Sequence, residues 1–211
     1  MSDEAGLRAL LVGLAASLFA RGFSVGSAGN ISVRLDDGYL MTPTNSSLGR
    51  LDAARLSKLD AHFVHLSGDP PSKEVFLHRA FYTARPLAGA VVHLHSTMAT
   101  AVACLADVDA ACPIPSLTPY FVMRVGRTMP VVPYYRPGDA AMEPAVLAAA
   151  RGARAVLLAN HGPVVCGATL TDAVYAAEEL EEAAKLFLAL RGHGARLLTP
   201  AQVDDLLATF G

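Results

Sequence analysis

Hydrophobic positions near the start of the chain recur with the spacing of an amphipathic helix. Five leucines lie three or four residues apart, which places them on one face of a helix: Leu7, Leu10, Leu11, Leu14 and Leu18. Ser2 can cap this helix, and the acidic Asp3 and Glu4 suit its first turn. Gly22 predicts its end, so the chain should open with a helix whose leucine face packs on the core.

The pattern changes to strict alternation of apolar and polar side chains at residues 30–35. A period of two is typical of a strand that buries one face. The sequence Asp-Asp-Gly at 36–38 is a turn signal, and residues 39–42 resume the apolar pattern. This region therefore predicts a β-hairpin, which requires a sheet that is at least partly antiparallel.

Helical and strand-like patterns alternate along the remainder of the chain. Helices are predicted at 72–84, 96–105, 139–151 and 171–190, and a capping box at 199–202 opens a last short one. Strands are predicted at 89–95, 155–158 and 164–166, and the proline-rich residues 111–138 should form loops around one or two short strands. The acidic residues of the long helix, 178–182, are interpreted as a solvated face. Without repeats or linkers, the chain is expected to form one α/β domain over residues 1–211, with helices on both sides of the sheet.

Composition excludes several classes of protein. Of the 211 residues, 53% are hydrophobic and 17% are charged, the opposite of a disordered chain. The net charge of −2 excludes nucleic-acid binding through bulk positive charge. The apolar stretch at 7–20 is shorter than a bilayer requires, and acidic residues precede it where a signal peptide would be basic. Since the membrane is excluded, the apolar composition predicts an oligomer.

Three cysteines, Cys104, Cys112 and Cys166, form no C-x-x-C pair. An odd number of cysteines, without the spacing of metal ligands or of a disulfide framework, is typical of reduced thiols in a reducing compartment. We therefore expect a cytoplasmic protein.

The histidines at 93 and 95 carry the first candidate chemistry. In a strand, residues i and i+2 share a face and lie about 6.5–7 Å apart, so two imidazoles can converge on one ion. His161 lies in a tight turn between two predicted strands, and three histidines with an open position are typical of a catalytic metal site. Spacing alone equally allows ordinary half-buried histidines. His62, His65, His78 and His193 lack partners at ligand spacing and are assigned no role.

Two further groups of residues admit both a functional and a structural interpretation. Glu74 follows Ser72 and Lys73 at the start of a predicted helix, where it either favours the helix dipole or serves an anion site. The small and hydroxyl-bearing residues at 26–30 and 42–47 could cradle a phosphate, or could simply form two turns.

In combination, these motifs resemble the class II aldolase/adducin family. The motifs that carry the resemblance are GNIS at 29–32, TPT at 42–44, PSKE at 71–74, VHLH at 92–95 and NHG at 160–162. Further stretches are similar to the branch that decarboxylates 3-oxo-tetronate 4-phosphate: TPY at 118–120, VMR at 122–124, VPYYRPGD at 132–139 and LANHGPVVCG at 158–167. The resemblance implies a three-layer α/β/α fold with a mainly antiparallel central sheet, in a homotetramer with active sites between subunits.

The resemblance also implies a role for each candidate residue. His93, His95 and His161 would hold one divalent ion per subunit, Zn²⁺ by preference, with Mn²⁺ or Co²⁺ as alternatives. Glu74 would act as the acid/base and would ligate the metal when substrate is absent. The phosphate of a sugar-acid substrate would be bound by Asn30, Thr44, Asn45 and Ser72.

The implied reaction releases CO₂ from a 3-oxo acid through a metal-stabilised enediolate, which then takes a proton to give dihydroxyacetone phosphate. Glu74 and Tyr120 are the alternative proton donors. Lys73, Arg124 or Arg136 would meet the substrate carboxylate, or Lys73 would reinforce the phosphate site. The alternatives in function are a sugar-phosphate aldolase of the fuculose or rhamnulose 1-phosphate type and a non-catalytic adducin-like module.

Two departures from the aldolase pattern favour the decarboxylase over the aldolase. Lys73 replaces the second serine that precedes the glutamate in the aldolase pattern. No tyrosine follows Tyr175, whereas the aldolase brings one from its C-terminal tail.

Overall fold

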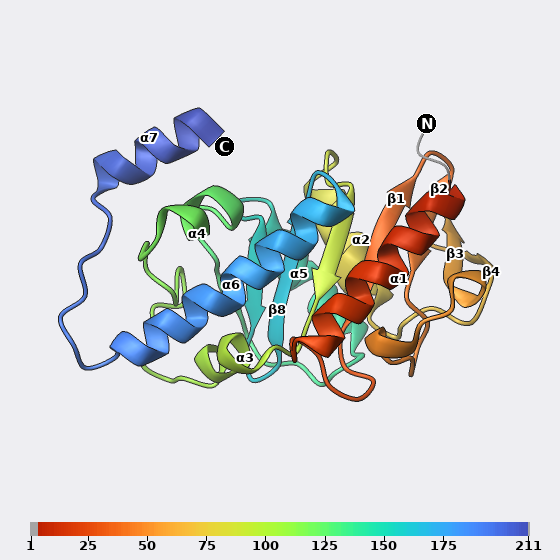
Figure 1. Cartoon of the computed structure of the whole chain (residues 1–211), viewed down its shortest axis with the longest axis horizontal. Coiled ribbons are helices and arrows are strands. Elements are labelled where there is room, and N and C mark those ends of the chain that lie inside the picture. Colours follow the sequence, from red (N-terminus) through yellow and green to blue (C-terminus); the bar gives the residue numbers. More distant parts are fainter. Residues whose placement is uncertain (1–3, 211) are drawn as a thin grey trace.

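A computed structural model describes residues 4–210 and shows one eight-stranded sheet in the order β4-β3-β2-β1-β5-β8-β7-β6 (Figure 1). The strands are β1 Asn30–Leu35, β2 Gly38–Met41, β3 Ser57–Asp60, β4 His65–Ser67, β5 Ala90–His93, β6 Val131–Val132, β7 Ala155–Leu158 and β8 Gly162–Gly167. Every neighbouring pair is antiparallel except β6 and β7. The mainly antiparallel central sheet is therefore confirmed.

Helices cover both faces of this sheet. One face carries α1 Glu4–Ala20, α3 Thr97–Ala103, α4 Pro119–Arg124 and α6 Leu170–Leu190, and the other carries α2 Val75–Ala84 and α5 Glu143–Ala150. Figure 1 shows α1 and α6 lying side by side in front of the strands. The last helix, α7 Pro200–Phe210, packs on α4, and short 3₁₀ turns occupy Leu48–Arg50, Ala53–Arg55 and Ala140–Met142. The three-layer α/β/α fold is confirmed.

Each helical layer encloses its own apolar core. Leu11 and Leu18 of α1 and Leu180 of α6 are fully buried against one face of the sheet. Phe76 of α2 and Val146 of α5 are buried against the other face. No helix among residues 4–210 combines the length and the apolar character that a membrane span requires.

The predicted hairpin and the predicted capping box are both present. Ser32 pairs with Met41 and Leu35 with Gly38, as the alternating pattern requires. At α7, the Thr199 amide donates to Gln202 Oε1 over 2.9 Å and the Gln202 amide donates to Thr199 Oγ1 over 3.3 Å. The reciprocal bonds satisfy amides that a bare helix end would leave unpaired.

Two details of the first predicted helix need comment. Leu10 is 42% exposed, so the buried stripe runs through Leu11, Ala15 and Leu18 and does not include every leucine. The predicted cap at Ser2 and the first-turn position of Asp3 lie outside the described residues.

Several other predictions were wrong in detail. Residues 111–138 contain α4, which begins at Pro119 because the Thr118 hydroxyl caps the Phe121 amide over 3.2 Å. The short strands β3 and β4 were not predicted. The acidic stretch of α6 is not uniformly solvated, since Glu181 accepts the amides of Met98 and Ala99, each over 2.8 Å. This carboxylate thus fixes the start of α3.

Candidate metal centre

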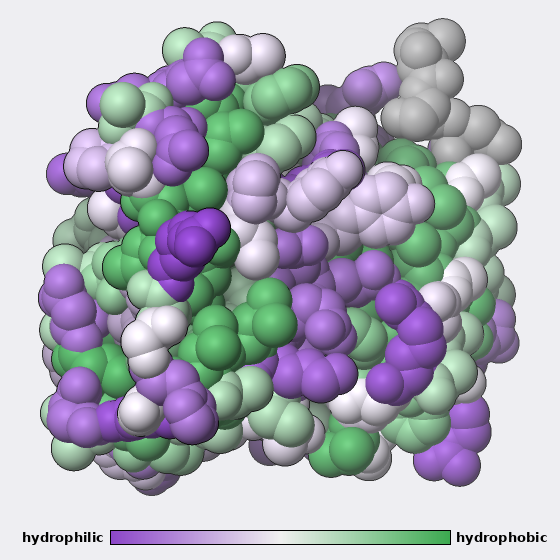
Figure 2. All heavy atoms as spheres, turned by 60° about the vertical axis from the view of Figure 1, so that its left-hand side comes forward, coloured by the Kyte–Doolittle hydropathy of each residue, from purple (hydrophilic) through white to green (hydrophobic). Residues whose placement is uncertain are grey.

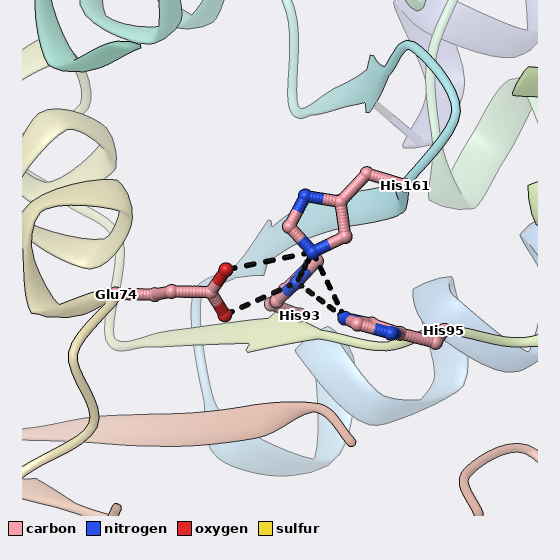
Figure 3. A group of neighbouring side chains, drawn as sticks. All are labelled: Glu74, His93, His95 and His161. Carbon is pink, nitrogen blue, oxygen red and sulfur yellow. Dashed lines mark hydrogen bonds and ion pairs between the residues drawn. The ribbon is translucent and has the colours of Figure 1, made fainter. Parts of the chain in front are cut away.

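Four side chains from three parts of the chain converge on one point (Figure 3). His93 ends β5, His95 follows it by two residues, His161 lies in the turn between β7 and β8, and Glu74 directly precedes α2. The three Nε2 atoms lie 3.0–3.3 Å from one another. The carboxylate oxygens of Glu74 lie 3.5 Å from His93 Nε2 and 3.4 Å from His161 Nε2. The structure thus brings together the four predicted metal ligands.

His93 is held in the middle of the sheet. Its strand pairs with β1 on one side and β8 on the other, where His93 faces Asn30 and Val164. Its Nδ1 lies 2.9 Å from the Pro163 carbonyl oxygen, which only accepts hydrogen bonds. Nδ1 therefore carries the proton, and Nε2 presents a lone pair toward the cluster.

The turn that carries His161 depends on two unusual backbone positions. Asn160 adopts a left-handed conformation with φ of 56°. Gly162 lies so close to the segment after β5 that a Cβ atom there would be 2.3 Å from the Leu94 carbonyl oxygen. A glycine is therefore required for β8 to approach the segment that carries His95.

The environment of His93, His95 and His161 favours the neutral form of each imidazole. Burial, followed by the neighbouring His161 and His95, lowers the pKa of His93 well below its ordinary value. Burial is also the largest cause of the lowered pKa values of His95 and His161. Because a neutral imidazole has a free lone pair, lowered pKa values keep the ring nitrogens available as ligands.

The spacing of the three imidazole nitrogens fits a tetrahedral ion. Two ligands at about 2.0–2.1 Å from a tetrahedral centre lie about 3.3–3.4 Å apart. The separations between neighbouring donor atoms, 3.0–3.5 Å, bracket that value. Three imidazole nitrogens with one carboxylate are a donor set for divalent Zn, Mn or Co. The arrangement is consequently compatible with a divalent ion.

Comparison with known proteins agrees with this geometry. Residues 9–188 match the family model described as the class II aldolase and adducin N-terminal domain. The chain belongs to the class II aldolase family. It is 50% identical over 211 residues to the 3-oxo-tetronate 4-phosphate decarboxylase of Escherichia coli K12, covering 98% of this chain and 99% of that protein.

Solved structures of other class II aldolase relatives have the same fold. YgbL from Klebsiella pneumoniae is 48% identical, with a TM-score of 0.94 over 98% of this chain and 100% of that one. An L-fuculose 1-phosphate aldolase is 26% identical, with a TM-score of 0.86 over 96% of this chain and 95% of that one.

Two of the four predicted phosphate ligands of this class II aldolase homologue contact Glu74 of the cluster, and the other two lie in the loop after β2. Asn30 Nδ2 donates to Glu74 Oε2 over 2.9 Å, and the Ser72 hydroxyl accepts the Glu74 amide over 3.2 Å. The Thr44 amide donates to the Pro70 carbonyl over 2.9 Å, which joins the loop after β2 to the segment before α2. Thr44 and Asn45 line a surface cavity of about 330 Å³ in that loop.

Other predicted residues are not brought to the cluster within one chain. Tyr120 is 62% exposed on α4, which packs on the face of the sheet opposite α2. Arg124 lies on the same helix, 3.5 Å from Asp172, with its guanidinium 5.5 Å from the Tyr175 ring. Lys73 is exposed on the α2 side of the sheet and lies beside the loop that contains Arg136.

One residue near the cluster was missed from sequence. His78 is fully buried on α2 and hydrogen-bonded to Asn30 Oδ1 over 2.6 Å. A search for metal-ligand spacing passes over His78, but its position four residues after Glu74 places both side chains on one face of a helix. That helical spacing is the signal that could have found it.

Proposed function

We propose that this chain is a 3-oxo-tetronate 4-phosphate decarboxylase that converts its substrate to dihydroxyacetone phosphate and CO₂. Two observations together support this proposal. The chain is 50% identical to an enzyme of that name over 98% of its length, and it has a compact cluster of three histidines and one glutamate. A binding module would have no need for such a donor set.

The reaction requires an electron acceptor and a proton. The bond between the carboxylate and C2 breaks, its electron pair moves to the C3 carbonyl, and a proton must then be delivered to C2. A divalent ion bound by His93, His95 and His161 supplies Lewis acidity that stabilises the negative charge on the carbonyl oxygen. Zn²⁺ is our assignment for that ion, on the basis of the near-tetrahedral nitrogen set.

Glu74 is our candidate for the proton donor. Its carboxylate lies 3.4–3.5 Å from two ligand nitrogens and is 13% exposed, so substrate bound at the cluster is within its reach. It would leave the ion when substrate arrives and act as the acid/base. Tyr120 remains the alternative donor, supplied by a neighbouring subunit, since its own chain holds it on the other side of the sheet.

The substrate phosphate is assigned to the residues beside Glu74. The Asn30 amide carries two hydrogens, and the bond to Glu74 uses one, so the second can be donated to a phosphate oxygen. Ser72, Thr44 and Asn45 supply further donors from the two joined loops. Lys73 lies on the same side of the sheet and is our assignment for the substrate carboxylate or for reinforcement of the phosphate site.

We further propose a homotetramer with active sites between subunits. Large apolar side chains remain exposed in the single chain, including Leu87 at 94% and Val25 at 66%. Figure 2 shows hydrophobic side chains interspersed with hydrophilic ones on the surface of the molecule. Burial of such side chains between subunits would favour assembly. The single domain over residues 1–211 and the cytoplasmic location stay predictions.

The test is a direct assay of the metal-loaded protein with 3-oxo-tetronate 4-phosphate. We expect release of CO₂ and dihydroxyacetone phosphate in equal amounts, and loss of both after chelation. Fuculose 1-phosphate and rhamnulose 1-phosphate are the matched competing substrates. Cleavage of either without CO₂ release from the oxo acid would replace the decarboxylase with an aldolase.

A further inference from the structure

A linear hydrogen-bond network connects a buried tyrosine with Glu74. The Tyr82 hydroxyl lies 2.9 Å from Ser32 Oγ, which lies 2.7 Å from His78 Nδ1. His78 Nε2 lies 2.6 Å from Asn30 Oδ1, and Asn30 Nδ2 lies 2.9 Å from Glu74 Oε2. His78 and Tyr82 come from α2, four residues apart, and Glu74 directly precedes that helix. Asn30 and Ser32 come from β1, two residues apart.

The direction of every hydrogen bond in this network follows from the bond between Asn30 and Glu74. Asn30 Nδ2 donates to Glu74 Oε2, so the Asn30 carbonyl oxygen faces His78. A carbonyl oxygen only accepts, so His78 must carry a proton on Nε2. The Asn30 orientation and the His78 tautomer are therefore two aspects of one arrangement.

The remaining bonds fix His78 in that tautomer. Burial lowers the pKa of His78 to about 3, so the ring is neutral near pH 7 and Nδ1 is an acceptor. Ser32 donates its only hydroxyl proton to Nδ1, so the Tyr82 hydroxyl must donate to Ser32. Burial raises the pKa of Tyr82, which keeps that donor protonated.

The four members of this hydrogen-bond network behind Glu74 are almost entirely shielded from water. The exposed fractions are 4% for Asn30 and Tyr82, 1% for Ser32 and 0% for His78. Solvent therefore cannot replace a missing member, and a buried polar group left unpaired costs about 1–3 kcal/mol. Without the His78 donor, rotation of the Asn30 amide would place its carbonyl oxygen against the Glu74 carboxylate.

We propose that His78 is a positioning residue for the reaction: as the Nε2–H tautomer it holds the Asn30 amide, which in turn orients the Glu74 carboxylate. This assignment rests on the proposed function, in which Glu74 is the acid/base. His78 touches neither substrate nor metal ligand and acts through Asn30 alone.

The test compares two variants at one position. His78→Leu fills the space but removes the donor, whereas His78→Gln keeps an N–H group near the position of Nε2. We expect His78→Leu to lower kcat by about 10–100-fold, the usual cost of disturbing an outer-shell partner, with any rise in KM smaller than the fall in kcat. His78→Gln should recover most of that loss. Equal loss in both variants, or a loss in KM alone, would overturn the proposal.

A double-mutant cycle with Glu74→Gln separates positioning from a general structural role. If His78 acts through Glu74, His78→Leu should lower kcat no further in the Glu74→Gln background. Additive losses would show that His78 supports the fold and does not orient Glu74.

A third measurement needs neither substrate nor metal. Nitrogen-15 NMR of the metal-free protein should show His78 protonated on Nε2 and bare on Nδ1, and Ser32→Ala should weaken that preference. A proton on Nδ1 would overturn the proposal. If the wild-type protein releases no CO₂ yet shows the expected tautomer, the proposed function fails while the direction of the hydrogen bonds stands.

Discussion

The two faces of strand β1 differ in chemical character. On one face, Ile31 and Val33 are buried in the apolar core beneath α1 and α6. On the other face, Asn30 and Ser32 are equally buried but form hydrogen bonds to side chains of α2. One strand therefore supplies a stabilising surface and a positioning surface, separated only by the alternation of its side chains.

The polar face is continued by Arg34. Its Nε donates to the Ala88 carbonyl over 2.9 Å, and its guanidinium lies 4.8 Å from the centre of the Tyr82 ring. Buried polar groups contribute little net stability but are costly when a partner is lost. Changes on the apolar face should therefore lower stability, whereas changes on the polar face should alter the chemistry of the site.

Loss of a metal ligand should have the largest effect. His93→Ala removes the central imidazole, so we expect loss of the bound ion and of decarboxylase activity together. The loss in metal affinity should exceed the roughly 10–100-fold cost of disturbing an outer-shell partner. Metal analysis of the purified variant and a CO₂ assay check this prediction. His65→Ala, at an exposed histidine of β4, is the control that should retain the ion. Activity in a metal-free His93→Ala protein would contradict the site.

Substitution of the proposed acid/base should come next. Glu74→Gln keeps the shape of the side chain and the Ser72 contact of its amide but removes the transferable proton. We expect kcat to fall by about 10²-fold or more, the usual order for a general acid or base. Steady-state kinetics measure the loss, and an unchanged kcat would remove Glu74 from the mechanism.

The apolar face should respond in stability. Leu180→Ala, in the core under α6, should lower the free energy of unfolding by about 2–5 kcal/mol because it leaves a cavity. The kcat of the folded fraction should stay the same. Denaturant unfolding monitored by circular dichroism tests the first expectation. Lys185→Ala, exposed on the same helix, is the control and should change stability by no more than about 0.5 kcal/mol. A fall in kcat for Leu180→Ala would contradict the separation of roles.

Lowering the pH should gradually decrease the free energy of unfolding through His78 on the polar side of the sheet. The pKa of His78 is about 3 in the fold and 6.5 in the unfolded chain, so between these values the unfolded state binds more protons. The contribution of neutral His78 to the free energy of unfolding is therefore complete above pH 6.5. It is lost as the pH falls toward 3, by roughly 1.4 kcal/mol per pH unit. Unfolding of the wild-type protein and His78→Gln across this range measures the difference. Plots of the free energy of unfolding against pH for the two proteins should diverge below pH 6.5 and run parallel above it. Parallel slopes throughout would contradict the burial of His78.

Local patterns predicted the elements that depend on local physics. The hairpin follows from alternation around Asp-Asp-Gly, and α7 follows from the capping box at Thr199. In contrast, α4 was missed because the prolines of residues 111–138 were interpreted as loop signals, although Pro119 occupies the first turn of α4, where proline is tolerated. Strand β4 was missed because its three residues are exposed and lack an apolar pattern.

The candidate site was predictable in its members but not in its arrangement. His93 and His95 are close in sequence, whereas His161 approaches them only because β8 pairs with β5, a contact between distant segments. The role of His78 depends on the register between β1 and α2, which no short motif contains. Spacing within one element can be predicted from sequence, but contact between two elements requires the fold.

Gly162 bears on how the site could be redesigned. It supplies no ligand atom, yet the missing side chain sets how closely β8 approaches the segment that carries His95. Backbone clearance at Gly162 thus limits how far apart the segments that carry His161 and His95 must lie. An engineer who wished to admit a larger ion, while keeping all four donors, would begin with this glycine.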